Sequence, residues 1–192
     1  MESTSQVDDL PQVGGNASQE LKLKIFGFLQ QRSKDIRQLR PLMAGFEVET
    51  ISRLIWREIS VLNNSEESER LQGRVVFEIT VDEDMLNPRG TLHGACSGLL
   101  IDHCSTMPIL VLGLAAGGQG ELGVSQSLNV VYHSPAMLGD KLRIVCTTLT
   151  LGNRALSSRC EIWDETSHRL VASGVHTKMA ASPPKDKPVS KL

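Results

Sequence analysis

One segment near the middle of the chain combines residue types that suit chemistry on a carbonyl group. An amide (Asn87), an imidazole (His93) and a bare backbone (Gly94) precede an apolar run that carries one carboxylate, Asp102. We expect a helix to begin near Gly94, where unpaired N–H groups and the positive end of the helix dipole can hold a carbonyl oxygen as it becomes an oxyanion. Asp102 would then supply the base.

The spacing between Gly94 and Asp102 predicts how many subunits build such a site. The two lie eight residues apart, and a helix of that length rises about 12 Å because each residue adds about 1.5 Å. One chain cannot bring both groups to one carbonyl, so a catalytic Asp102 requires a second subunit and two composite sites related by two-fold symmetry. The alternative is that Asp102 is a hydrogen-bonded structural residue of the apolar helix.

Composition limits the class of protein. The chain has 192 residues of which 40% are hydrophobic, which suits one well-packed domain. Its net charge of −2 comes from 20 basic and 22 acidic residues, so charge favours neither nucleic acid nor an anionic membrane surface as a partner. No run approaches the roughly 20 apolar residues that cross a bilayer, so we expect no membrane span and no secretory signal.

The cysteines and glycines indicate no bound metal or organic cofactor. The four cysteines show no C-x-x-C spacing and are expected to be buried, reduced thiols. They are Cys96, Cys104, Cys146 and Cys160. The glycine cluster at 117–120 lacks the Gly-Lys-Ser/Thr of a phosphate loop, and no G-x-S-x-G nucleophile elbow is present. We therefore expect no cofactor.

Four regions follow one another along the chain. Residues 1–19 are polar without periodicity and are expected to form a disordered leader. Residues 20–44 contain a helix with apolar residues at helical spacing, followed by a linker, and residues 45–181 form the main domain. Residues 182–192 are expected to be a flexible tail.

Hydrophobic periodicity gives the order of elements in the main domain. Alternation over residues 47–62 predicts one long strand, which pairs as a hairpin with a strand that includes residues 75–81. An apolar helix then runs from Gly94 to about Leu114, with Pro108 expected to kink it or to end its regular part. Four further strands are expected at 122–133, 141–151, 155–164 and 170–179. This order predicts an α+β fold in which an antiparallel sheet buries its apolar face against the long helix.

The last three residues, Ser190-Lys191-Leu192, match the tripeptide that a peroxisomal import receptor recognises. They follow a proline- and lysine-rich stretch that would leave them accessible to the receptor. We therefore expect a peroxisomal location, with the cytoplasm or the mitochondrion as alternatives.

A series of short motifs occurs in a fixed order over residues 45–181. They are Asn87-x5-His93-Gly94-x7-Asp102, Ser105-Thr106-Met107, the strand 123–132 with Ser125, Ser134-Pro135-Ala136, Gly139-Asp140 and the closing run 172–178. In this order they resemble the hotdog-fold acyl-CoA thioesterases of the phenylacetic-acid-degradation and thioesterase-superfamily-member type. The resemblance implies a hotdog fold, a curved antiparallel sheet wrapped around a long central helix. It also implies a homodimer with one continuous sheet, or a homotetramer made of two such dimers, with active sites at the dimer interface.

The resemblance also implies a role for each motif residue. The Gly94 N–H would bind the thioester carbonyl, His93 would position the region of that carbonyl, and Asn87 would orient the attacking water or the thioester. Asp102 of the partner subunit would act as general base or as nucleophile, and Ser125 would position the water or the carboxylate. Ala95 stands where many relatives carry a second glycine.

The function that these residues predict is hydrolysis of a fatty or aryl acyl-CoA to the free acid and CoA, without a cofactor. Two alternatives stay open. One is a hotdog protein that binds acyl-CoA without catalysis, and the other is a hotdog hydratase or dehydratase. Hydratase motifs usually place an Asp before a His, whereas here His93 precedes Asp102 by nine residues.

Overall fold

The computed structural model describes residues 12–39, 48–67, 69–152 and 155–179. The end of the expected linker and the Ser190-Lys191-Leu192 tail lie outside these residues. Within them the elements are α1 (Gln19–Leu39), α2 (Val48–Ser52), β1 (Ile55–Asn63), β2 (Leu71–Thr80), the 3-10 helix η1 (Glu83–Met85), α3 (Gly94–Ala115), β3 (Val124–Tyr132), β4 (Lys141–Leu151), β5 (Ala155–Asp164) and β6 (Arg169–Met179).

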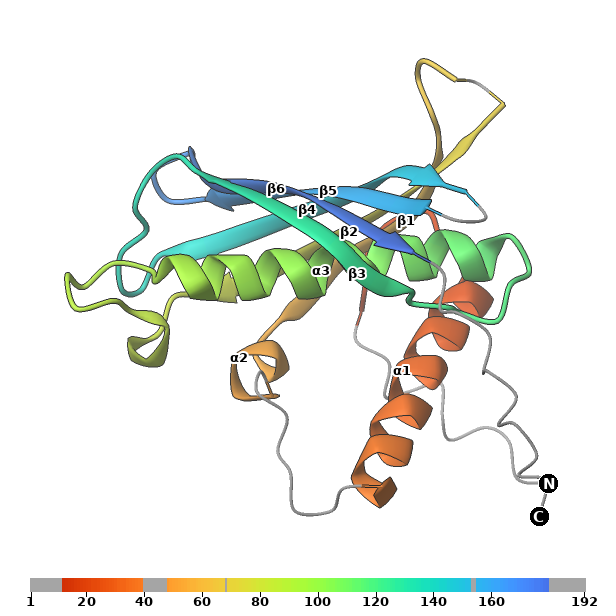
Figure 1. Cartoon of the computed structure of the whole chain (residues 1–192), viewed down its shortest axis with the longest axis horizontal. Helices are drawn as coiled ribbons and strands as arrows, with labels where there is room; N and C mark the ends of the chain where they lie inside the picture. Colours follow the sequence, from red (N-terminus) through yellow and green to blue (C-terminus); the bar gives the residue numbers. More distant parts are fainter. Residues whose placement is uncertain (1–11, 40–47, 68, 153–154, 180–192) are drawn as a thin grey trace, which may run out of the picture.

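A six-stranded sheet in the order β1-β2-β4-β5-β6-β3 lies over α3, and every pair of neighbouring strands is antiparallel (Figure 1). Helix α1 lies on the side of α3 away from the sheet, near the C-terminal end of α3. This arrangement confirms the expected α+β fold with a long central helix and an additional N-terminal helix.

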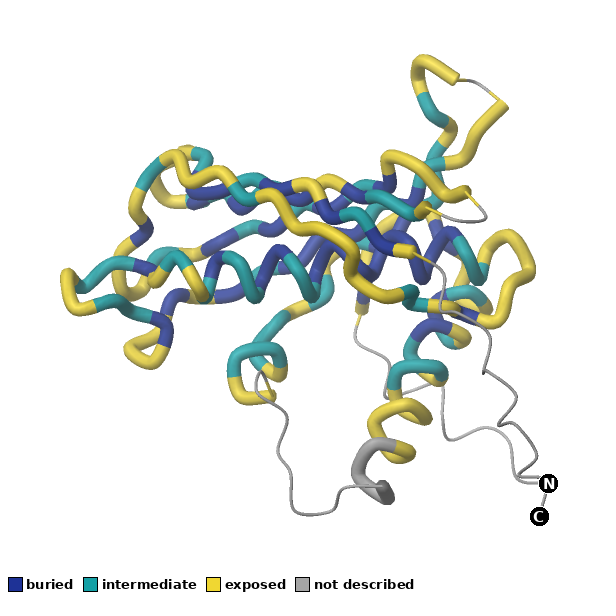
Figure 2. Tube along the Cα trace, in the orientation of Figure 1, coloured by how far each residue is buried: buried dark blue, intermediate teal, exposed yellow. Residues whose placement is uncertain are grey.

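The core lies between α3 and the inner face of the sheet. Its largest fully buried side chains include Phe77 and Ile79 of β2, Leu100 and Ile101 of α3, and Ile144 of β4. The sequence pattern of α3 is apolar on all sides because the helix is covered by the sheet on one face and partly by α1 on another. Figure 2 shows buried residues along most of α3 and along the strands above it.

Helix α3 is long and apolar enough to cross a membrane by length and composition, which differs from the sequence-based expectation that no run approaches such a span. The structure gives another reason for this composition, because most of the helix from Leu100 to Leu112 is buried inside the protein. Pro108 does not end the helix, which continues to Ala115. Burial against the sheet stabilises the continuation more than the missing proline N–H weakens it.

The long strand expected over residues 47–62 is wrong in its first part, where residues 48–52 form the short helix α2 and the strand begins at Ile55. The Leu54 N–H donates to the Ile51 carbonyl in a turn between the two elements. The guanidinium of Arg53 donates to Asp82 and to Asp84 at 2.8–2.9 Å, which ties this turn to η1. These partners are about 30 positions away in sequence, so local alternation could not predict the turn.

Residues 12–18, expected to be part of a disordered leader, instead pack along the outer edge of β1. Gly14 N–H donates to the Arg57 carbonyl, and Ile59 N–H donates back to the Gly14 carbonyl. Val13 and Ala17 are buried, and the Lys22 ammonium donates to the Val13 carbonyl at 2.8 Å. This segment covers one edge of the sheet.

The opposite edge of the sheet is β3, and no described segment pairs with its free side. All of its residues except Val130 are exposed, and Figure 2 shows the strand as an almost unbroken exposed stretch. Several of these exposed side chains are apolar, with Val124 at 54% and Tyr132 at 58% exposure. An exposed apolar edge strand is a template for pairing with another chain.

Candidate active site

The predicted site residues fall into two groups at different positions along α3. Asn87, His93 and Gly94 lie in and beside the loop that leads into the helix. Asp102 lies about two turns further along α3, and Ser125 is beside it on β3. The structure therefore brings Ser125 to Asp102 and keeps the other three residues apart from that pair.

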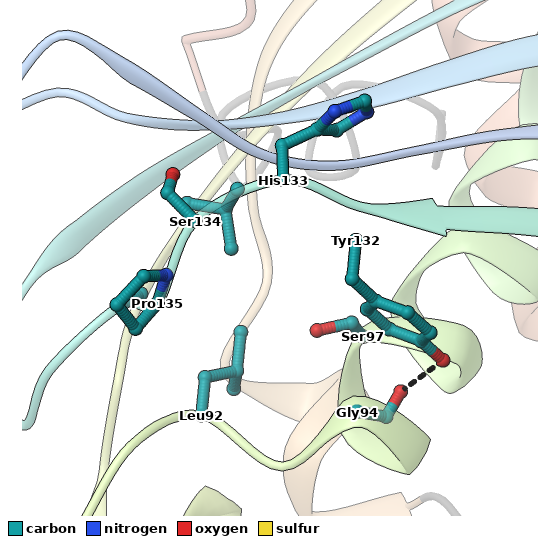
Figure 3. Close-up of a pocket in the computed structure, with 9 residues that line it drawn as sticks. Leu92, Gly94, Ser97, Tyr132, His133, Ser134 and Pro135 are labelled. Atoms are coloured by element: carbon teal, nitrogen blue, oxygen red, sulfur yellow. Dashed lines mark hydrogen bonds between the residues drawn. The ribbon is translucent and has the colours of Figure 1, made fainter.

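Gly94 lines a cavity of about 360 Å³ at the N-terminus of α3. The other lining residues are Leu92, Ser97, Tyr132, His133, Ser134, Pro135, Ala136 and Val171 (Figure 3). The Tyr132 hydroxyl donates to the Gly94 carbonyl at 3.0 Å and so fastens the first turn of α3 to the end of β3. Helix geometry leaves the N–H of Gly94 without an intrahelical acceptor.

His93 is the N-cap of α3. Its Nδ1 accepts a hydrogen bond from the Ala95 N–H at 3.0 Å, and its carbonyl accepts from Ser97 N–H as the first bond of the helix. Capping of this kind satisfies one of the N–H groups that a helix leaves unpaired at its start. The imidazole thus fixes where the helix begins, and with it the direction of the Gly94 N–H.

Asn87 organises the turn before the helix. Its side-chain oxygen accepts from the N–H groups of Arg89 and Thr91, and its amide nitrogen donates to the Thr91 hydroxyl at 2.8 Å. One amide hydrogen of Asn87 remains for another acceptor, because an amide NH₂ carries two. The turn role is thus shown by the geometry, whereas a role in orienting water stays a prediction.

Asp102 is the carboxylate of the second group, and 46% of its side chain is exposed. The Ser125 hydroxyl donates to its Oδ1 at 3.4 Å, and His176 Nε2 lies 3.4 Å from the same oxygen. A half-exposed carboxylate held on one oxygen by neighbouring groups can still meet water with the other. This is the environment expected for a general base.

His176 of β6 lies within the closing run 172–178, but the sequence analysis assigned it no role. It is fully buried, with Nδ1 at 2.8 Å from the Ser105 hydroxyl and Nε2 at 2.9 Å from that of Ser125. Burial lowers the pKa of His176 below its usual value, and the Lys178 ammonium lowers it further, while Asp102 acts in the opposite direction. The imidazole is therefore neutral near physiological pH.

Lys178 lies two positions further along β6 and is also buried. Its ammonium donates to the hydroxyls of Thr106 at 3.1 Å and Ser125 at 3.4 Å. Burial lowers its pKa, and the negative charge of Asp102 partly opposes that shift. The signal in the sequence was alternation, because His176 and Lys178 occupy the inward positions of a strand whose outward neighbours are Val175 and Thr177.

Ser125, His176 and Asp102 do not form a nucleophile triad. In such a triad the serine contacts one ring nitrogen and the carboxylate orients the histidine through the other. Here both Ser125 and Asp102 approach Nε2, and the hydroxyl of Ser105 occupies Nδ1. The geometry favours a supported carboxylate over an activated serine.

Comparisons with known proteins show the family and the fold of this chain. Residues 89–171 match the thioesterase superfamily. Human acyl-coenzyme A thioesterase 13 is 35% identical over 106 residues, which cover 55% of this chain and 72% of that protein. The mouse protein of the same name is 32% identical over 105 residues, with coverages of 55% and 71%. The crystal structure of zebrafish thioesterase superfamily member 2 covers 79% of this chain and 97% of its own, with 28% identity and a TM-score of 0.58.

The six-stranded antiparallel sheet over one long helix is the hotdog fold, as the resemblance of the motifs implied. The chain belongs to the thioesterase superfamily and is a thioesterase. No three His, Cys, Asp or Glu side chains among the described residues are grouped as metal ligands.

Proposed function

We propose that this protein hydrolyses acyl-CoA thioesters to the free acid and CoA in composite sites formed between two copies of the chain. The observation that carries the proposal is the division of the site residues. One group surrounds the N-terminus of α3, the other surrounds Asp102, and the helix keeps them about 12 Å apart. The names of the similar human and mouse proteins support acyl-CoA as the substrate class.

The open edge of the sheet offers a way to bring the two groups together. Tyr132 at the end of β3 is hydrogen-bonded to Gly94, and Ser125 near the start of β3 is hydrogen-bonded to Asp102. If two β3 strands pair antiparallel about a two-fold axis, the start of one strand lies opposite the end of the other. The Asp102 group of one copy then faces the Gly94 group of its partner, twice in each dimer.

The reaction follows from the chemistry of the two groups. The Gly94 N–H, at the positive end of the α3 dipole, donates to the thioester oxygen as negative charge develops there. The partner subunit's Asp102 takes a proton from a water molecule, which attacks the carbonyl carbon, and the thiolate of CoA leaves. Ser125 holds the carboxylate, His93 fixes the start of the helix, and Asn87 has one amide hydrogen available for the thioester or the water.

The first experiment measures free thiol released from acyl-CoAs of increasing chain length and from aryl-CoAs. We expect turnover by the wild type and a loss of at least about 100-fold in Asp102→Asn, because general-base catalysis contributes about 10²–10⁴-fold. The matched control is Asp35→Asn, an exposed Asp of α1 whose carboxylate accepts from the Gln31 amide. Binding of acyl-CoA without thiol release would support the binding-protein alternative instead.

A complementation experiment tests the composite site. Gly94→Pro removes the N–H donor, and proline is well tolerated at the first position of a helix. Mixed dimers of Gly94→Pro and Asp102→Asn contain one site with both changes and one with neither, so they should recover about half of the wild-type activity per dimer. If mixed dimers form but stay as inactive as the two parents, each site lies within one chain and the composite arrangement is wrong.

A further inference from the structure

The cavity at the N-terminus of α3 contains one hydroxyl group to which the reaction above assigns no role. Ser97 is only 2% exposed, yet it lines the cavity together with Gly94. Figure 3 shows its side-chain oxygen directed into the space between Leu92, Tyr132 and Ser134. The sequence analysis did not single out this serine.

Helix geometry places the Ser97 hydroxyl near the Gly94 backbone. Residues three apart lie on the same face of a helix, and side chains tilt toward the N-terminus. The Ser97 side chain therefore extends back over the first turn, where the Gly94 N–H is unpaired. Both groups line the same cavity.

The other polar side chains that line the cavity all bond to the surrounding protein. The Tyr132 hydroxyl donates to the Gly94 carbonyl, His133 Nε2 contacts the Ser173 hydroxyl at 2.9 Å, and the Ser134 hydroxyl donates to the Leu170 carbonyl. Within the described part of the chain, the Ser97 hydroxyl has no such partner, and it is not one of the fully enclosed unpaired atoms, so it is accessible from the cavity. A hydroxyl that is accessible from a cavity and has no partner in the described chain can donate its hydrogen to a group bound there.

We propose that Ser97 is a catalytic residue whose hydroxyl joins the Gly94 N–H as the second donor to the thioester oxygen. This inference rests on the proposed hydrolysis and adds a residue to its oxyanion site. The hydroxyl stabilises the oxyanion as water adds to the carbonyl carbon, and it releases that oxygen when the carbonyl forms again and the C–S bond breaks. Ser97 transfers no proton.

The test compares Ser97→Ala with Ser97→Thr in steady-state hydrolysis of the acyl-CoA that the wild type turns over best. Loss of one oxyanion donor lowers kcat by about 10²–10³, so we expect Ser97→Ala to lose about 100-fold in kcat with little change in KM. Ser97→Thr keeps a hydroxyl and should stay within about tenfold of the wild type. Ser157→Ala on β5, a strand that contributes no residue to the cavity lining, is the control.

A second readout separates this role from a structural one. Alanine removes a hydroxyl that has no partner among the described residues and is a better helix former, so Ser97→Ala should unfold at the same or a higher denaturant concentration than the wild type. Lower kcat with retained stability supports the proposal. Unchanged kcat, a change confined to KM, or activity lost only in parallel with stability overturns it. Wild-type turnover reports on the proposed function, whereas the ratio of variant to wild type reports on Ser97 alone.

Discussion

The substitution Gly73→Ala tests how closely the central helix and the sheet are packed. Gly73 of β2 is buried beneath α3, and a Cβ built there would lie 2.4 Å from the Pro108 carbonyl oxygen and 3.2 Å from the Leu112 side chain. Ordinary contacts of a Cβ begin near 3.4 Å, so the helix backbone would have to move away by about 1 Å. A backbone carbonyl cannot turn aside as the end of a flexible side chain can.

Overpacking of a dense core costs about 1–3 kcal/mol, and a rigid backbone obstacle places Gly73→Ala near the upper end, at about 2–3 kcal/mol. For a chain of this size we expect a melting temperature lower by about 4–12 °C. The same shift moves Asp102, which lies on α3 less than two turns before Pro108. Since a misplacement of about 1 Å can cost about 100-fold in rate, kcat should also fall.

The assay combines thermal unfolding followed by circular dichroism with thiol release at a temperature where the variant stays folded. Gly27→Ala is the matched control, because Gly27 lies within α1 with open space around its Cβ position. That change should stabilise the protein by up to about 1 kcal/mol through helix propensity. A Gly73→Ala protein that melts within about 2 °C of the wild type and keeps its kcat would refute the close packing of β2 and α3.

Three further predictions concern other parts of the chain. Burial holds the pKa of His176 below its usual 6.5, so the unfolded state binds more protons than the folded state at and below that pH. The free energy of unfolding should therefore fall as the pH decreases through this range. His176→Gln should reduce the difference between the denaturation midpoints measured at about pH 7.5 and about pH 5.5. A chain that begins at residue 19 loses the segment 12–18 that covers β1, and it should unfold at lower denaturant and aggregate more readily, as light scattering would detect. Removal of Ser190–Leu192 should leave hydrolysis unchanged and abolish import of a fluorescent fusion into peroxisomes, and unchanged location would contradict a peroxisomal address.

Periodicity predicted the elements whose partners are local or repeated. The strands β4 and β5 begin and end where the sequence analysis placed them, because inward and outward residues alternate along most of each strand. Helix α3 begins at Gly94 as expected, since His93 can cap it only at that point. These features depend on residues within one turn or one strand, which a sequence displays directly.

The features that were missed depend on partners far away in sequence. Helix α2 replaces the first part of a predicted strand because Arg53 is held by Asp82 and Asp84. The segment 12–18 is ordered by hydrogen bonds to β1, more than 40 positions away. A polar composition describes what a segment would do alone, and here backbone pairing with another strand overrides it.

The candidate site shows the same difference between features set by neighbouring residues and features set by distant ones. Its motif residues could be found because they are neighbours along the chain, but His176 meets Ser105 across 71 positions. Ser97 was passed over because a serine within an apolar helix carries no signal by itself. Its significance comes from a cavity whose walls are contributed by three separate segments of the chain.

The unequal edges of the sheet have a consequence for assembly at high concentration. In polymer chemistry a monomer with one reactive end can only terminate growth, whereas a monomer with two propagates it. Residues 12–18 cover β1 and β3 is open, so the described sheet has one edge available for pairing with another strand. In polymer terms, its functionality is one. Crowding should therefore increase the number of dimers joined through β3 without extending them into fibres. Residues 12–18 act as a chain stopper, because they block the other edge of the sheet.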